Sequence, residues 1–183
     1  STSGTLSIVK EAKRRGVKVT CEVTPHHLTL TDQLVMGSFE EEKVFDPLSS
    51  LAYDTSAKVN PPLRNKADVS VMAEGLSDGT IDFIATDHAP HSSIDKMCTF
   101  QEAAFGISVL ETALGSVLTL LHNGSITLPK LISKLSTEPA RFLNSNLGTL
   151  QVGKPADITI FDPNKGWYVD SSKFLSKGKN TPL

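Results

Sequence analysis

Short apolar runs that end in polar residues alternate with segments of helical periodicity along the first 145 residues. Such runs predict strands, and β-branched residues are enriched in the first of them, residues 17–23. The strands are expected at residues 17–23, 56–60 and 81–86. Helices are expected at residues 6–13, 69–76, 109–121, 128–135 and 138–144, the first with Ser3 as its N-cap and Gly16 as its stop. Strands with apolar residues on both faces are typical of a parallel α/β sheet.

Three strands are too few to close a barrel, which uses about eight strands and about 250 residues. We therefore predict the C-terminal part of a (β/α)8 barrel at residues 1–145. After Asn144 the pattern changes, and strands expected at 148–161 and 167–169 predict part of a small β-sandwich domain at 146–183. The chain opens on Ser1 without Met and stops in a loop-like passage, so we expect missing sequence at both ends.

Composition excludes several classes of protein. Hydrophobic residues make up 39% of the chain and charged residues 21%, with a net charge of -2 and no basic cluster, so neither nucleic acid nor a membrane surface is an expected partner. The apolar run at 113–121 is too short to span a bilayer. No export signal is visible, so we expect a cytoplasmic protein in which Cys21 and Cys98 are free thiols.

Polar side chains follow each expected strand, at the edge where parallel α/β folds form active sites. Asp87 follows the run 81–86, and a carboxylate there can bind a metal ion or move a proton between water and a leaving group. A helix cap or a loop salt bridge is the alternative for Asp87, but His91 and Asn60 nearby in the pattern favour a site.

The remaining polar residues each have a structural alternative. On an extended strand, at most one of His26 and His27 faces a central site, and either could instead bond the backbone. Asn60 offers a donor and an acceptor that suit a cyclic amide, or it is a turn residue. Arg64 could pair with a substrate carboxylate, or it is a solvated loop charge.

Six segments occur together in one order, and together they resemble the bacterial-type dihydroorotases of the amidohydrolase superfamily. The segments are TPHHL at 24–28, VNPPLR at 59–64, ATDHAPH at 85–91, FGI at 105–107, LETA at 110–113 and GKPADITIFD at 153–162. The stretch DHAPH with NPPLR ahead of it is specific to dihydroorotases, whereas the last segment is a general signature of the superfamily.

The resemblance implies zinc-dependent, reversible hydrolysis of dihydroorotate to carbamoyl aspartate in pyrimidine biosynthesis. By position, Asp87 matches the metal-linked catalytic aspartate. Asn60, His91, Phe105 and Gly106 match residues that bind the substrate. Ser1 and Thr2 resemble the end of a His-Val-Ser-Thr motif, so the remaining zinc ligands are expected upstream of Ser1.

Two departures leave alternatives open. The family's His-x-His pair is absent, and the stretch 36–51 is longer than expected, which predicts a surface insertion. The chain could therefore belong to another cyclic amidohydrolase, such as an allantoinase or a dihydropyrimidinase, although a carboxylate contact at His91 argues against both. It could also be a catalytically silent scaffold domain. In either case, the expected partners are a second copy of the chain or another enzyme of a multienzyme assembly.

Overall fold

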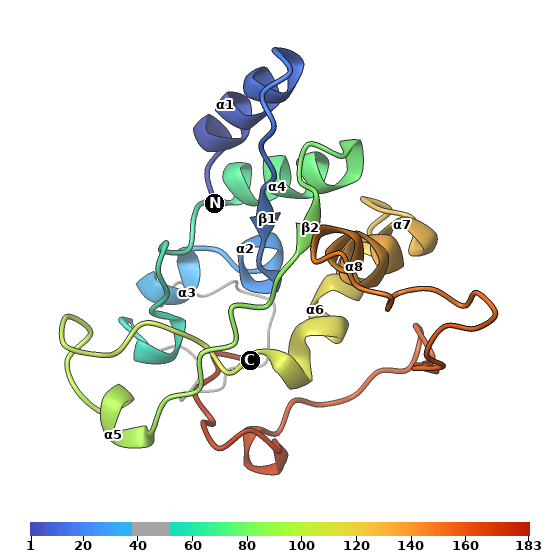
Figure 1. Ribbon diagram of the computed structural model, residues 1–183. Coiled ribbons are helices and arrows are strands. Elements are labelled where there is room, and N and C mark those ends of the chain that lie inside the picture. Colours follow the sequence, from blue (N-terminus) through green and yellow to red (C-terminus); the bar gives the residue numbers. More distant parts are fainter. Residues whose placement is uncertain (38–51) are drawn as a thin grey trace.

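Two short parallel strands form the centre of the fold. A computed structural model describes residues 1–37 and 52–183. In it, β1 (Glu22–Val23) pairs with β2 (Phe83–Ile84) in parallel, with Val23 opposite Ile84 (Figure 1). The parallel α/β arrangement is confirmed, but paired strands are much shorter than expected from the apolar runs at 17–23 and 81–86. The strand expected at 56–60 was wrong, because a 3₁₀ turn, η1 (Thr55–Ala57), begins this segment.

The three longest helices match the sequence periodicity closely. They are α1 (Ser3–Arg14), α4 (Lys66–Asp78) and α6 (Leu110–His122). Thr2 rather than Ser3 caps α1, since its hydroxyl accepts the amide of Thr5, and Gly16 follows the helix at φ +77°. The two helices expected at 128–144 form one continuous helical stretch: α7 (Leu128–Ile132), a π-helical turn η2 (Ser133–Thr137) and α8 (Glu138–Phe142).

Short helices occupy segments for which the sequence predicted none. They are α2 (Pro25–Thr29), α3 (Gln33–Met36), α5 (Ser93–Lys96) and the 3₁₀ turn η3 (Ser171–Lys173). Ser92 and Asp95 form a capping box that starts α5. Most of the insertion expected at 36–51 lies outside the described residues.

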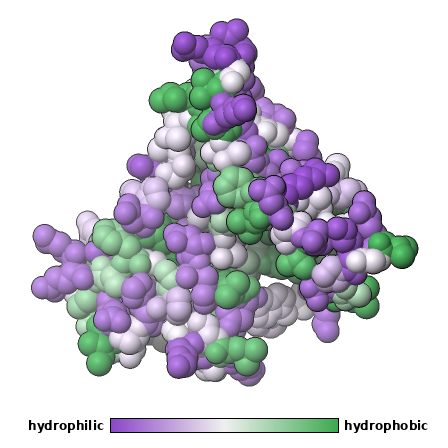
Figure 2. All heavy atoms as spheres, viewed as in Figure 1, coloured by the Kyte–Doolittle hydropathy of each residue, from purple (hydrophilic) through white to green (hydrophobic). Residues whose placement is uncertain are grey.

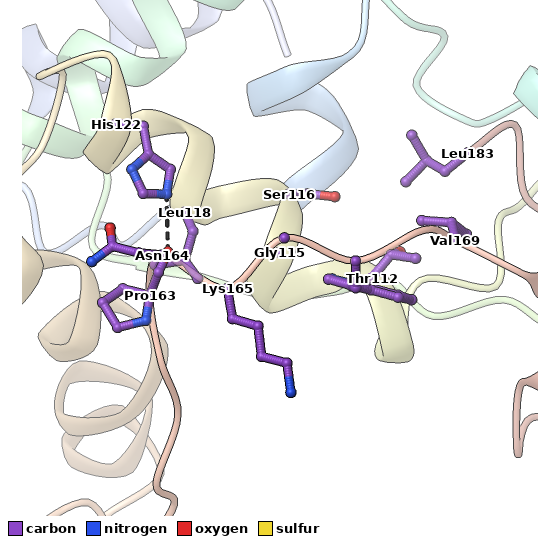
Figure 3. Close-up of a pocket in the computed structure, with 12 residues that line it drawn as sticks. Thr112, Gly115, Ser116, Leu118, His122, Pro163, Asn164, Lys165, Val169 and Leu183 are labelled. Carbon is purple, nitrogen blue, oxygen red and sulfur yellow. Dashed lines mark hydrogen bonds between the residues drawn. The ribbon is translucent and has the colours of Figure 1, made fainter.

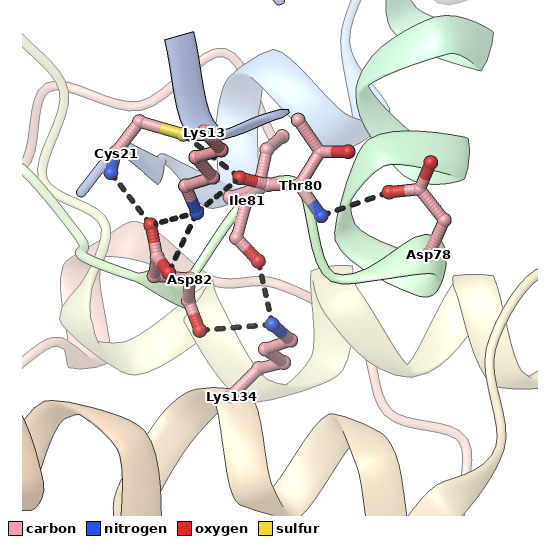
Figure 4. A network of polar contacts seen from close by, with 7 residues as sticks. All are labelled: Lys13, Cys21, Asp78, Thr80, Ile81, Asp82 and Lys134. Atoms are coloured by element: carbon pink, nitrogen blue, oxygen red, sulfur yellow. Dashed lines mark hydrogen bonds and ion pairs between the residues drawn. The ribbon is translucent and has the colours of Figure 1, made fainter. Parts of the chain in front are cut away.

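The main hydrophobic core lies between the strands and helices α4, α6 and α7. Its most deeply buried members are Leu76, Val117, Leu28 and Leu131. A polar network joins α1 and α7–η2 to the strands (Figure 4). The Asp82 carboxylate accepts from Lys13 Nζ and from the Cys21 amide, and the Lys134 ammonium donates to the carbonyls of Ile81 and Asp82.

A second, smaller core supports the loops that follow the strands. It comprises Ala57, Val59, Leu63, Ile107, Val109 and Ala113. These residues come from the segments around Asn60, from the segment after Gly106 and from the start of α6. The second core therefore packs beneath the segments that carry the expected site residues.

The C-terminal tail does not form the expected β domain within the described residues. No strand is assigned at 148–161 or 167–169, and the tail runs from α8 in extended loops back to the start of α6, where the C-terminus lies (Figure 1). Ile158 and Ile160 are 64% and 93% exposed, because no strand among the described residues pairs with this segment or covers its apolar side chains. The domain boundary at 145/146 stays a prediction.

The molecular surface carries many apolar side chains. Figure 2 shows hydrophobic residues scattered among hydrophilic ones on the face in view. Among residues 1–37 and 52–183, no helix has both the length and the apolar character needed to cross a bilayer. Both cysteines are free, as expected.

Candidate active site

The segments that leave β1 and β2 emerge at one edge, because the two strands are parallel. After β1 the chain enters α2 directly, since Thr24 caps the helix and Pro25 occupies its first turn. The expectation that His26 and His27 continue an extended strand was therefore wrong. The Thr-Pro pair ahead of the histidines was the local signal for a helix start.

His27 has a structural role at this edge. Its Nδ1 lies 2.7 Å from Thr24 Oγ1, and its Nε2 lies 2.9 Å from the Pro61 carbonyl oxygen. With Nε2–H as the donor to Pro61, Nδ1 accepts from the threonine hydroxyl. Burial lowers the His27 pKa, and the hydrogen bond to Pro61 and the nearby negative charge of Asp87 oppose that shift. His27 thus ties the segment after Asn60 to the edge at which Asp87 lies.

His26 is buried beside His27, with ring centroids 4.6 Å apart. Neither ring nitrogen of His26 has a hydrogen-bond partner among the described residues. Burial, followed by the proximity of His27, lowers the His26 pKa to about 3. His26 is therefore neutral at physiological pH.

Asp87 sits at an unusual backbone position just beyond β2. Its φ is +49°, in the left-handed region that L-residues seldom adopt, although Asp and Asn tolerate it better than most. The side chain is exposed. A carboxylate on a sharp turn after a buried strand is available to a ligand, a metal ion or a water molecule at this edge.

His88, the next residue, supports α6 rather than the reaction. Its Nδ1 accepts the amides of Val109 and Leu110, at 3.0 and 3.2 Å. Val109 is the N-cap residue of α6 and Leu110 its first residue, and the helix has no internal acceptors for these amides. His88 therefore caps α6 and fixes the segment immediately after Asp87.

Three of the expected substrate residues lie together. His91 Nε2 is 2.9 Å from the Phe105 carbonyl oxygen. Gly106 has φ +135°, and a Cβ built there would lie 2.4 Å from the Cβ of Ala89 and 3.3 Å from His91 Nε2, so only glycine fits. The Phe105 side chain is 55% exposed, and Gly106 is buried.

The segment that leads to Asn60 is joined to this group through Lys58. The Lys58 carbonyl accepts the Gly106 amide at 2.9 Å, and Asn60 itself is exposed two residues later. The Gly106 carbonyl accepts from the side chain of Asn180. Both backbone groups of Gly106 are thus bonded within the protein.

Two buried lysines form hydrogen bonds that hold the loop before Phe105. No pattern in the sequence indicated a role for either of them. Lys58 Nζ donates to the carbonyls of Gln101 and Ala103 and lies 4.4 Å from the centroid of the Phe105 ring. Lys96 Nζ donates to the carbonyls of Thr55 and Ala104, and burial lowers the Lys96 pKa. Lysine is normally a surface residue, so no local pattern would have identified these roles.

The described residues supply one candidate metal ligand rather than a complete set. No group of three or more His, Cys, Asp or Glu residues in the ranges 1–37 and 52–183 is placed to hold a metal ion. The Asp87 carboxylate suits zinc as a single oxygen ligand, whereas catalytic zinc sites typically use about three protein ligands. Arg64, a second candidate for substrate contact, has a buried Nε with no partner among the described residues.

A cavity of about 330 Å³ lies elsewhere, between α6 and the tail. Thr112, Gly115 and His122 line it from α6, and the tail residues 163–167 close it (Figure 3). His122 Nε2 lies 3.0 Å from the Pro163 carbonyl oxygen across its rim. None of the expected site residues lines this cavity, so it is separate from the candidate active site.

Comparisons with known proteins agree on one family. The model of the amidohydrolase family matches residues 2–182. Dihydroorotases from Syntrophus aciditrophicus and Geobacter metallireducens are 47% and 49% identical over all 183 residues. The chain spans 39% and 40% of the length of these two relatives. The resemblance to dihydroorotases read from the sequence motifs is thereby confirmed.

Solved structures support the same fold. An L-hydantoinase (dihydropyrimidinase) from Arthrobacter aurescens matches the whole chain with a TM-score of 0.85 and 29% identity, and the match covers 38% of that protein. A D-hydantoinase (dihydropyrimidinase) from Thermus sp. matches 85% of the chain with a TM-score of 0.71 and 25% identity, and the match covers 33% of that protein.

Proposed function

Since this chain belongs to the amidohydrolase family, we propose that it forms part of a dihydroorotase active site and contributes the catalytic aspartate, Asp87. The reaction is the reversible hydrolysis of dihydroorotate to carbamoyl aspartate. Identity of 47–49% with dihydroorotases along the entire chain is the observation that carries this proposal. The position of Asp87 at the strand edge supports it.

Asp87 is assigned the proton transfer. In hydrolysis, the oxygen of the attacking water bonds to the ring carbonyl carbon, and the bond from that carbon to the ring nitrogen breaks. The exposed Asp87 carboxylate accepts the proton of the water and delivers it to the departing nitrogen. In the reverse direction the same group removes a proton from the ureido nitrogen.

Asn60, His91, Phe105 and Gly106 are assigned to substrate binding. The amide of Asn60 can donate to and accept from the ring amide, and the His91 ring can donate to the substrate carboxylate. The hydrogen bonds that join Lys58 to Gly106 and His91 to Phe105 hold these residues in one group. Such preorganisation lowers the entropic part of the barrier.

Zinc is the proposed cofactor, with Asp87 as one of its ligands. A zinc ion polarises the carbonyl and acidifies the attacking water. Residues 1–37 and 52–183 hold no cluster of three ligands, so the proposal requires ligands beyond these described residues. We further propose, from the resemblance, that the 183-residue chain alone turns over no dihydroorotate. The resemblance also leads us to propose a cytoplasmic enzyme of pyrimidine biosynthesis, with a second copy or another enzyme as its partner.

The substitution Asp87→Asn tests the assignment in the full-length protein as its source organism expresses it. Asn tolerates the left-handed backbone at this position but cannot accept the proton. Turnover of dihydroorotate, followed by absorbance, is expected to fall by about 100-fold or more with an unchanged thermal midpoint. Asp162→Asn is the matched control, because Asp162 is exposed and its side chain only accepts the amide of Asn164. Near-normal turnover by Asp87→Asn would exclude the proton-transfer role.

A hydantoinase or dihydropyrimidinase is the second candidate, favoured by the TM-score of 0.85 with the Arthrobacter aurescens enzyme. The substrates of such enzymes lack the ring carboxylate of dihydroorotate. Parallel assays with dihydroorotate, dihydrouracil and hydantoin separate the two candidates. Preference for either of the last two would replace the dihydroorotase proposal, and no turnover of any of the three would favour the silent scaffold domain.

A further inference from the structure

Asn180, near the end of the tail, is a buried hub of hydrogen bonds. Its side-chain oxygen accepts the His91 amide and lies within bonding distance of Ser108 Oγ, both at 2.8 Å. Its side-chain nitrogen donates to the carbonyls of Ala89 and Gly106, both at 3.0 Å. An amide offers two donors and two acceptor sites. Both donors are used and one acceptor site takes the His91 amide, whereas the single hydroxyl proton of Ser108 serves either the Asn180 oxygen or the Gly178 carbonyl oxygen. These bonds are consistent with a residue that is only 7% exposed.

The partners of Asn180 belong to two segments that carry proposed substrate residues. Ala89 and His91 lie on the loop after Asp87, whereas Gly106 and Ser108 lie on the segment after Phe105. These segments are also joined by the amide of Ala89 donating to Ile107, by the contact of His91 with Phe105 and, just beyond Ser108, by His88 accepting the amides of Val109 and Leu110. The Asn180 amide therefore acts as a bracket that sets their spacing.

The tail backbone is itself pressed against the loop. A Cβ at Gly178 would lie 2.6 Å from the His91 nitrogen and from the Pro90 Cα, so a side chain cannot be accommodated there. Ser108 is fully buried, its hydroxyl is 2.9 Å from the Gly178 carbonyl oxygen, and its amide donates to the Asn180 carbonyl at 2.7 Å. These contacts hold the tail in a position from which Asn180 reaches both segments.

We propose that Asn180 is a positioning residue that fixes His91 relative to Phe105 and Gly106 and thereby sets the affinity for the carboxylate end of the substrate. This inference rests on the proposed function. The polar side-chain atoms of Asn180 bond protein groups of the two segments. Asn180 acts through backbone groups, so its loss displaces the binding group and leaves Asp87 in place.

Steady-state kinetics of the full-length protein test the proposal. Asn180→Ala removes the whole bracket, and the isosteric Asn180→Asp keeps the acceptor for His91 but loses both donors. We expect KM for dihydroorotate to rise about tenfold with kcat within about threefold of wild type, less than the roughly 100-fold loss that a 1 Å misplacement can cause. Asn164→Ala is the matched control, because Asn164 is an exposed asparagine of the same tail. A purely structural role would instead lower kcat in proportion to folded protein and leave KM unchanged, which would overturn the proposal.

Hydrogen exchange separates this inference from the proposed function. The His91 amide is bonded to Asn180, so exchange in a peptide covering residues 87–92 should accelerate at least about tenfold in Asn180→Ala, which removes the acceptor. If the wild-type protein turns over neither dihydroorotate nor carbamoyl aspartate, the proposed function fails and exchange alone decides the positioning role. Unchanged exchange then overturns it, and faster exchange confined to this loop and to residues 105–108 supports it.

Discussion

Removing the Asp82 carboxylate should destabilise the pairing of β1 with β2, on which the site edge depends. Asp82 accepts from Lys13 Nζ at 2.7 and 2.8 Å and from the Cys21 amide at 2.8 Å, and its own amide donates to the Cys21 carbonyl (Figure 4). The side chains of Lys13 and Asp82 are 25% and 27% exposed, so the pair lies between the surface and the interior.

The magnitude follows from these contacts. A surface ion pair contributes about 0–1 kcal/mol, and we assign the upper end to a pair that is three-quarters buried. A hydrogen bond from an amide to a charged group contributes about 1.5–3 kcal/mol, and we take the lower end for Cys21 because water reaches the carboxylate. Asp82→Ala should therefore lower the free energy of unfolding by about 2–3 kcal/mol, whereas Asp82→Asn, which can still accept from Cys21, should cost about half as much.

Urea unfolding followed by circular dichroism measures this change. Glu11→Ala is the control, because the Glu11–Arg14 pair is solvent-exposed on α1, and its loss should change the free energy of unfolding far less than the loss of the Asp82 carboxylate. If Asp82→Ala destabilises the protein no more than Glu11→Ala, the argument that this network holds the strands together is refuted.

Two further perturbations address the histidines. The His26 pKa of about 3 in the folded protein lies below its ordinary value of 6.5, so the unfolded chain binds more protons between these pH values and stability falls as pH decreases through that window. His26→Gln should reduce the slope of the free energy of unfolding against pH by up to roughly 1 kcal/mol per pH unit. Urea unfolding at pH values from 7 to 4 measures this slope, and an unchanged slope would contradict the burial argument. His88→Ala removes the cap of α6 and should cost about 1–2 kcal/mol in the same assay, whereas His122→Ala, at the exposed end of that helix, should cost clearly less.

Local sequence patterns predicted the long helices because those patterns act over one or two turns. The apolar spacing through Met72 and Leu76 in α4 and through Val117 and Leu120 in α6 places buried residues on one face, as the structure shows. The strands expected in the tail are not formed among the described residues, and the reason is tertiary rather than local. The alternation through Ile158 and Ile160 is a strand pattern, but a strand forms only when a partner strand satisfies its backbone.

The sequence by itself determined the family and pointed to the residues that we propose carry the chemistry, because motifs such as DHAPH and NPPLR are contiguous. It did not identify what holds those residues together. Three side chains form hydrogen bonds with backbone groups of the segments that carry the candidate site, across separations of 8 to 91 residues in the sequence. They belong to Lys58, Lys96 and Asn180. Such bonds arise because each buried carbonyl and amide must find a partner once the segments meet, and no periodicity records that requirement. Only the tertiary structure decided that an asparagine near the end of the tail brackets the loop that begins at Asp87.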